Sequence, residues 1–153
     1  MFATILWATD ASEAADGALV EALGLLDEGG RLIAFHCDER FSGGRAGGAP
    51  LLADEKDRRV KLQEQVAELR ESGIDAELVV KTTHHSTAGE ILKAAAAVYE
   101  VDAIVCGSRG FGLVAGALAG SVSMRLPHLA PCPVIVVSQK ATERAQLVAH
   151  QRS

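Results

Sequence analysis

Short apolar runs alternate with helical patterns along this chain, and this alternation limits the possible folds more than any other feature. The predicted strands are Ile5–Ala8, Arg31–Cys37, Ile74–Lys81, Val101–Cys106 and Val134–Val137. They are mostly continuous apolar runs, as in strands that are buried on both faces. A repeated strand–helix order with such strands is typical of a parallel sheet covered by helices. The sequence therefore predicts an α/β fold with an open five-stranded parallel sheet and helices on both faces.

The segments between the strands carry helix signals. Apolar residues recur at helical spacing after the first strand, and Gly29–Gly30 is expected to end that helix. Asp10 and Ser12 can both cap it, and Asp10 with Glu13 has the spacing of a capping box. The other predicted helices are Leu51–Glu71, Ala88–Tyr99 and Ser121–Leu129, and the predicted loops are Asp38–Ala49 and Thr82–Thr87. Gly73 is expected to end the first of these further helices.

The size and charge of the chain narrow the class of protein. Its 153 residues suit one domain, predicted at residues 1–140 with a polar tail at 141–153. A formal net charge of −5 argues against non-specific nucleic-acid binding, which depends on a basic surface. No basic signal-peptide start is present, and the longest apolar stretch, near Gly112–Gly120, is too short for a bilayer. Three cysteines at spacings that fit neither zinc nor C-x-x-C are expected to be free thiols of a cytoplasmic protein.

The stretch from Gly107 to Ser123, "GSRGFGLVAGALAGSVS", follows the fourth predicted strand and admits several interpretations. A dinucleotide fingerprint is weak, because its first glycine comes late and no acidic residue follows about twenty positions on. A Walker A loop is rejected, since the Gly-Lys pair is missing. Glycines spaced four apart can also serve only turns or close packing, without any ligand.

The predicted sheet indicates where a ligand would bind. In open parallel sheets, ligands lie outside the carboxyl ends of the strands, where the strand order reverses. The segments that follow strands one, two and four are therefore candidates: Thr9–Ser12, His36–Asp38 and Gly107–Ser123.

The spacing within the glycine stretch is specific. Gly107 and Gly110 are followed, after nine residues, by Gly120 and Ser121, which gives the pattern G-x2-G-x9-G-S/T. With this pattern the chain resembles the universal stress protein family of the nucleotide-binding kind, over about Thr4 to Ser138. The resemblance also rests on "ILWATDASEAA", "GEILKAAAAVYEVDAIVCGSRGFG" and "GSVSMRLPHLAPCPVIVVS". It implies the strand order 3-2-1-4-5 and a Rossmann-like fold of the adenine nucleotide alpha hydrolase kind.

The resemblance also implies a site for an adenine nucleotide. Asp10 would face the adenine and ribose, with Ala8 and Thr9 as its backbone neighbours, and the Cys37 backbone would meet the adenine edge. The implied ribose and phosphate shell is Cys106, Gly107, Arg109, Gly110, Gly120, Ser121, Val122 and Ser123. Glycine N–H groups, a helix N-terminus and serine hydroxyls suit phosphate oxygens. Each residue also has a plainer interpretation: Asp10 as a helix cap, and the cysteines as core thiols.

These features favour an ATP-binding regulatory protein, with Mg²⁺ held mainly by the nucleotide phosphates. An enzyme is less favoured, because no Walker lysine, SGGxDS-type loop or HIGH tetrapeptide is present, so no catalytic residue is assigned. Slow ATP hydrolysis remains open, since bound Mg²⁺ and N–H groups can stabilise charge without a base. A cyclic-AMP-binding variant and a ligand-free interaction module also remain open.

The fifth predicted strand bears on assembly. Val134–Val137 would leave unpaired N–H and C=O groups at an apolar sheet edge. Pairing with its copy in a second subunit would remove this liability, so a homodimer is expected, as the resemblance also implies.

The remaining polar features are expected to bind no ligand. His84 and His85 are adjacent, and adjacent residues of an extended chain point to opposite faces, which makes a poor metal clamp. His36 and His128 are expected to be structural. The charged helix Asp54–Glu71 is expected to present a solvated face.

Overall fold

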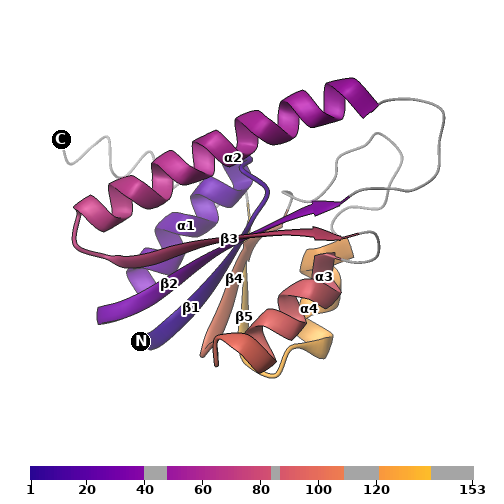
Figure 1. The fold of residues 1–153 in the computed structure, drawn as a ribbon. Helices are drawn as coiled ribbons and strands as arrows, with labels where there is room; N and C mark the ends of the chain where they lie inside the picture. The colour runs from indigo at the N-terminus through magenta and orange to yellow at the C-terminus, as the bar shows by residue number, and fades with distance from the viewer. Residues whose placement is uncertain (40–47, 84–86, 109–120, 139–153) are drawn as a thin grey trace.

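The computed structural model describes residues 1–39, 48–83, 87–108 and 121–138. Five parallel strands form one sheet in the order β3-β2-β1-β4-β5 (Figure 1), which confirms the predicted fold class. The strands are β1 (Phe2–Thr9), β2 (Leu26–Glu39), β3 (Asp75–Thr83), β4 (Ala103–Gly107) and β5 (Val134–Val137). The predicted loop Thr82–Thr87 therefore begins two residues too early, because Thr82 and Thr83 still pair with β2.

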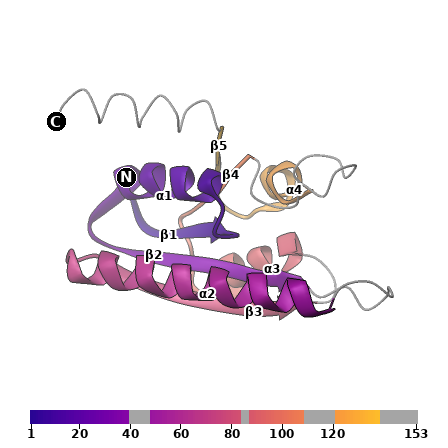
Figure 2. The same cartoon turned by 90° about the horizontal axis from the view of Figure 1, so that it is seen from above.

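Helices cover both faces of the sheet, as predicted. They are α1 (Glu13–Leu25), α2 (Gly48–Glu71), α3 (Thr87–Lys93), the π-helix η1 (Ala94–Val98) and α4 (Ser121–Leu129). Helices α1 and α2 pack on one face, and α3, η1 and α4 pack on the other (Figure 1). The long helix α2 runs beside β2 and β3 (Figure 2). The polar tail lies outside the described residues.

Alternation along the strands divides the core between the two faces. In β1, Leu6 and Ala8 belong to the cluster under α3 and α4, whereas Ile5 and Trp7 belong to the cluster under α1 and α2. Trp7 is fully buried, and its Nε1–H donates a 2.9 Å hydrogen bond to the Ala15 carbonyl oxygen of α1. The indole therefore fills the core without leaving its polar group unpaired.

The junction between α1 and β2 differs from the prediction. Gly29–Gly30 does not end the helix, because α1 ends at Leu25 and Leu26 is already extended. The pairing of β1 with β2 jumps from Leu26 to Arg31 across two residues of β1, so β2 is irregular here. Gly29 has φ 73°, and a Cβ at Gly30 would lie 2.9 Å from the Ala3 carbonyl oxygen. The glycines therefore serve a bulge rather than a helix stop.

The later helices agree better with the sequence. Helix α2 ends at Glu71, and the N–H groups of Gly73 and Ile74 bond to carbonyls of its last turn, so Gly73 ends it as predicted. Helix α4 has the predicted bounds. The alanine-rich helix instead divides after Lys93, and the π-helix begins at Ala94. The Tyr99 N–H bonds to the Ala94 carbonyl oxygen at 3.1 Å, a wider turn that leads the chain into β4.

Candidate functional site

The strand order reverses beside β1, which makes the carboxyl ends of β1 and β4 the switch point of the sheet. The chain runs outward from β1 through β2 to β3, and then crosses to β4 and β5 on the other side. The register pairs Ala8 with Cys106 and Thr9 with His36, so Cys37 and Gly107 each lie one residue beyond these pairs. Five predicted site residues, Ala8, Thr9, Cys37, Cys106 and Gly107, therefore meet at one edge of the sheet.

The loop that follows β1 is held by local hydrogen bonds. The Asp10 Oδ1 accepts from the Ser12 N–H at 3.0 Å, and the Thr9 hydroxyl oxygen accepts from the Ala11 N–H at 3.1 Å. Ser12 caps α1, its Oγ accepting from the Ala15 N–H at 3.3 Å, so the expected capping box of Asp10 with Glu13 does not form. The physical reason is that the Asp10 side chain closes the turn one step earlier. Asp10 is partly exposed at the carboxyl end of β1.

At the end of β4, Gly107 lies against the first turn of α1. A Cβ at this position would lie 2.7 Å from the Ala14 carbonyl oxygen. The glycine is therefore required by packing, whatever binds at the loop. The Ser108 N–H donates to the Val137 carbonyl oxygen at 2.9 Å and ties the chain to β5 as it leaves the sheet.

The two cysteines of the predicted site point into the core under α3 and α4. Cys106 is fully buried and Cys37 nearly so, and neither takes part in a disulfide. Burial raises the pKa of the Cys106 thiol to about 11, so the thiol stays protonated at neutral pH. At the switch point these two residues therefore offer backbone groups rather than their thiols.

The N-terminal turn of α4 supplies the last described part of the predicted site. Ser121 begins the helix, and Val122 and Ser123 are buried. Val122 belongs to the same core cluster as Ala8, Cys37 and Cys106. Arg109, Gly110 and Gly120 lie outside the described residues.

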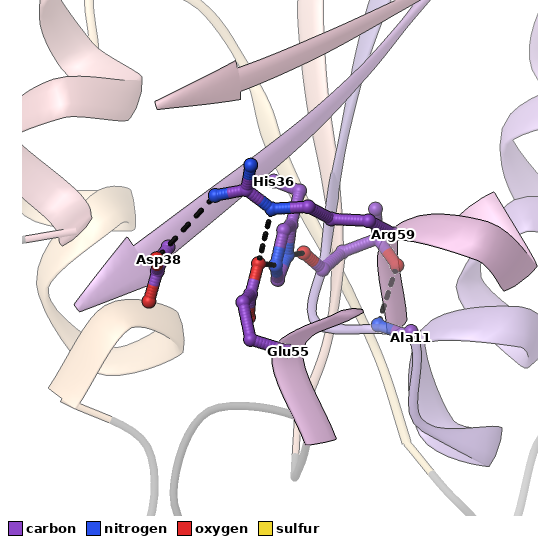
Figure 3. A network of polar contacts seen from close by, with 6 residues as sticks. Ala11, His36, Asp38, Glu55 and Arg59 are labelled. Carbon is purple, nitrogen blue, oxygen red and sulfur yellow. Dashed lines mark hydrogen bonds and ion pairs between the residues drawn. The ribbon is translucent and has the colours of Figure 1, made fainter. Parts of the chain in front are cut away.

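A buried polar chain beneath the loop was not foreseen. His36 is 1% exposed; its Nδ1 lies 2.9 Å from the Thr9 carbonyl oxygen, and its Nε2 lies 2.8 Å from the Glu55 Oε1. Arg59 donates to the same Glu55 oxygen at 3.0 Å and to the Asp38 Oδ2 at 3.4 Å (Figure 3). We call these four residues, His36, Asp38, Glu55 and Arg59, the His36 network.

The network refines the expectation that Asp54–Glu71 presents a solvated face. Glu55 is 8% exposed, so this acidic residue lies on the buried side of the helix rather than on its solvated face. The sequence spacing could have revealed the burial of Glu55. One face of the helix carries residues at helical intervals: Glu55, Arg59, Leu62 and Val66. Leu62 and Val66 are core residues, and that face therefore continues inward to Glu55.

Helix α2 touches the loop at a second place. The Lys61 ammonium donates to the Ala11 carbonyl oxygen and to the Asp16 Oδ2, both at 2.7 Å. Gln65 donates to the other Asp16 oxygen at 2.9 Å. Side chains from α2 thus reach both the loop and the first turns of α1.

Other kinds of site find little support in the described ranges. No three His, Cys, Asp or Glu side chains gather there as a metal site would require. None of the helices within the same ranges is long and apolar enough to cross a membrane. A hollow beside Gly29, Gly30 and Gly73 lies at the amino end of the sheet, away from the switch point.

Comparisons with known proteins agree with this geometry. The model of the universal stress protein family matches residues 1–138. A family member from Burkholderia pseudomallei is 26% identical, with a TM-score of 0.68 over 88% of this chain and 95% of that one. A family protein from Arabidopsis thaliana with AMP bound is 20% identical, with a TM-score of 0.65 over 92% and 94% of the two chains. A universal stress protein in complex with cAMP is 21% identical, with a TM-score of 0.57 over 89% and 97%. No curated protein matches the chain.

The family model covers most of the chain, and the sheet has the strand order that the resemblance implied. The solved structures share the fold along nearly their whole length. The chain belongs to the universal stress protein family.

Proposed function

We propose that this protein binds ATP at the switch point of its sheet and acts as a nucleotide-dependent regulator in the stress response. The observation that carries the proposal is the meeting of the Asp10 loop with the end of β4, where the glycine pattern begins. Family members of the same fold were solved with AMP or with cAMP. The two ligands share an adenosine with a phosphate group, which fits a site of this kind.

The roles of the site residues follow from their chemistry. The partly exposed Asp10 carboxylate can accept hydrogen bonds from ribose hydroxyls, and the backbone at Cys37 can meet the adenine edge. Phosphates would bind to N–H groups of the glycine pattern and of the first turn of α4, where the helix dipole favours anions. We assign Arg109, Gly110 and Gly120 to this phosphate shell, with Ser121, Val122 and Ser123. Mg²⁺ would be held by the nucleotide phosphates.

Cyclic AMP is the second candidate ligand, because a structural neighbour was solved with it. Its single cyclised phosphate would leave part of the phosphate shell unused. The residues that contact the adenine and the ribose would stay the same, whereas the protein would respond to cyclic AMP instead of ATP. For ATP we propose slow hydrolysis at most, and no catalytic residue is assigned.

We further propose a homodimer through β5. Among the described strands β5 pairs only with β4, and Val136 is 39% exposed. An unpaired apolar edge favours pairing with its own copy. Sedimentation at micromolar concentration should give a dimer, and Val136→Lys should shift it to monomer. A wild-type monomer would contradict the proposal.

The test of ligand binding starts from freshly purified protein. Denaturing it and identifying any released nucleotide by chromatography and mass shows what the site carries. Stripped protein is then titrated calorimetrically with ATP–Mg²⁺ and, separately, with cyclic AMP. We expect ATP binding to be lost in Gly120→Val. Gly24→Val is the control, because Gly24 is exposed on α1 and has no atom within 4 Å of an added Cβ.

The outcomes separate the candidates. Preferential binding of cyclic AMP would support the proposed site but identify cyclic AMP rather than ATP as its ligand. Equal loss of ATP binding in both glycine variants would point to general damage and count against the phosphate shell. No released nucleotide and no heat with either ligand would overturn the proposal and leave an interaction module.

A further inference from the structure

None of the four residues of the His36 network is assigned to the nucleotide shell, yet the network lies directly beneath the loop and contacts the Thr9 carbonyl oxygen. Both ring nitrogens of His36 face oxygen atoms, one of a carbonyl and one of a carboxylate. A carbonyl oxygen only accepts hydrogen bonds, so Nδ1 is the donor to Thr9, and Nε2 pairs with the Glu55 carboxyl group. The imidazole ring then bridges the end of β1 to helix α2.

The network continues from the His36 ring through charged side chains. His36 Nε2 contacts Glu55, whose carboxylate pairs with the Arg59 guanidinium, and the guanidinium also pairs with the Asp38 carboxylate. Well-packed apolar side chains often give equal or greater stability than such buried ionic groups. What the network does provide is a fixed position for the Thr9 carbonyl, because the ring is fully enclosed and bonded at both ends.

Lys61 holds the next part of the loop in the same way. Its ammonium bonds to the Ala11 carbonyl oxygen, and Ala11 has φ 65°, a left-handed conformation that is unfavourable for a residue with a side chain. The surrounding structure must therefore maintain this turn. Thr9 and Ala11 flank Asp10, so α2 grips both neighbours of the carboxylate that the proposed function assigns to the ribose.

We propose that His36, Glu55 and Lys61 are positioning residues that hold the Thr9 and Ala11 carbonyls, and thereby aim the Asp10 carboxylate at the ribose hydroxyls of a bound nucleotide. They make selectivity for ribonucleotides over deoxyribonucleotides depend on α2. This inference rests on the proposed function for its ligand. Its structural part, that side chains of α2 hold the loop through Lys61 and His36, requires no ligand and can be tested on the free protein.

The first measurement needs no nucleotide. The N–H groups of Ala11 and Ser12 are the donors that close the loop, so their hydrogen exchange reports its order directly. In Lys61→Met, exchange at these two amides should accelerate by about tenfold, the effect of losing a hydrogen bond from a charged donor. Lys56→Met is the matched control, because Lys56 is an exposed lysine of the same helix. Lys61→Arg should restore slow exchange.

The second measurement compares the affinities of ATP and 2′,3′-dideoxy-ATP for the full chain. Wild type should bind ATP more tightly than dideoxy-ATP. In Lys61→Met and Glu55→Gln the ratio of the two affinities should fall toward one, while the affinity for dideoxy-ATP stays the same. General destabilisation would weaken both nucleotides together, so the ratio separates positioning from folding. Lys61 is half-exposed, which keeps its variant foldable should Glu55→Gln prove unstable.

Each result has a distinct meaning. Unchanged hydrogen exchange at the Ala11 and Ser12 amides in Lys61→Met would overturn the claim that α2 holds the loop, independently of any nucleotide affinity. Faster exchange with an unchanged preference for ATP would overturn the role in ribose selectivity. A wild-type protein that binds neither ATP nor cyclic AMP would instead overturn the proposed function, and with it the ligand half of this inference.

Discussion

Replacing Gly107 with alanine tests how closely β4 and α1 approach each other at the switch point. The added Cβ would lie 2.7 Å from the Ala14 carbonyl oxygen and 2.9 Å from its carbonyl carbon. Favourable carbon–carbon contacts begin near 3.5 Å, so the carbon contact alone demands a shift of about 0.6 Å. Both partners are backbone, and neither can move aside as a flexible side chain would.

The expected cost lies at the upper end of the overpacking range. Strand β4 is paired on both sides, and α1 is anchored by the Trp7 hydrogen bond to Ala15. We therefore expect Gly107→Ala to lower the free energy of unfolding by about 2–3 kcal/mol. With an m-value of about 2 kcal/mol/M, the urea midpoint should fall by about 1–1.5 M.

Gly24→Ala is the matched control for this experiment. It makes the same chemical change on α1, but nothing lies within 4 Å of the new Cβ. Alanine is the better helix former, so this variant should gain about 0.5 kcal/mol. Urea unfolding without nucleotide, followed by circular dichroism, decides the matter. The packing argument is wrong if Gly107→Ala unfolds within about 0.3 M urea of wild type.

Two further predictions concern stability and thiol chemistry. Ser12→Ala should cost about 1 kcal/mol in urea unfolding, because it removes the cap on the Ala15 N–H; a stable variant would show that the bond contributes nothing. Burial raises the pKa of Cys106 from its ordinary 9.0 to about 11, so the folded state keeps a proton that the unfolded state loses between these values. The stability that the protonated Cys106 thiol contributes to the folded state is fully present below pH 9 and is lost as the pH rises to 11. The stability advantage of wild type over Cys106→Ala should therefore shrink by about 2 kcal/mol from pH 8 to pH 10.5; equal differences at both pH values would contradict it.

The sheet could be predicted because its information is local. Most strands contain a continuous apolar run, and the carboxyl-end rule brought Thr9, Cys37 and Gly107 to one edge. The family resemblance added the strand order. The bounds failed where tertiary pairing outweighed a local signal, as at Gly29–Gly30, which form a bulge inside β2.

The polar part of the site could be predicted less well, because partners came from distant segments. Glu55 looked like one more surface charge in an acidic helix, and nothing nearby in sequence indicated His36 as its partner. Asp10 was interpreted as a possible helix cap, but Ser12 is the cap, and the Asp10 side chain instead closes a turn with the Ser12 N–H. Gly107 was interpreted through a ligand, whereas its contact with Ala14 gives it a packing role as well.

The central position of β1 has a consequence for the synthesis of the protein. It is the first strand made, yet its bonds to the β4 side begin with Thr4 and Asp102, 98 positions apart. At ordinary translation rates this interval lasts on the order of ten seconds, during which Ile5–Ala8 keep one edge open. A nascent chain must shield that apolar edge before the sheet can close. Fragments that end before Ala103 lack β4 and keep this edge of β1 exposed permanently. We expect such truncated fragments to aggregate.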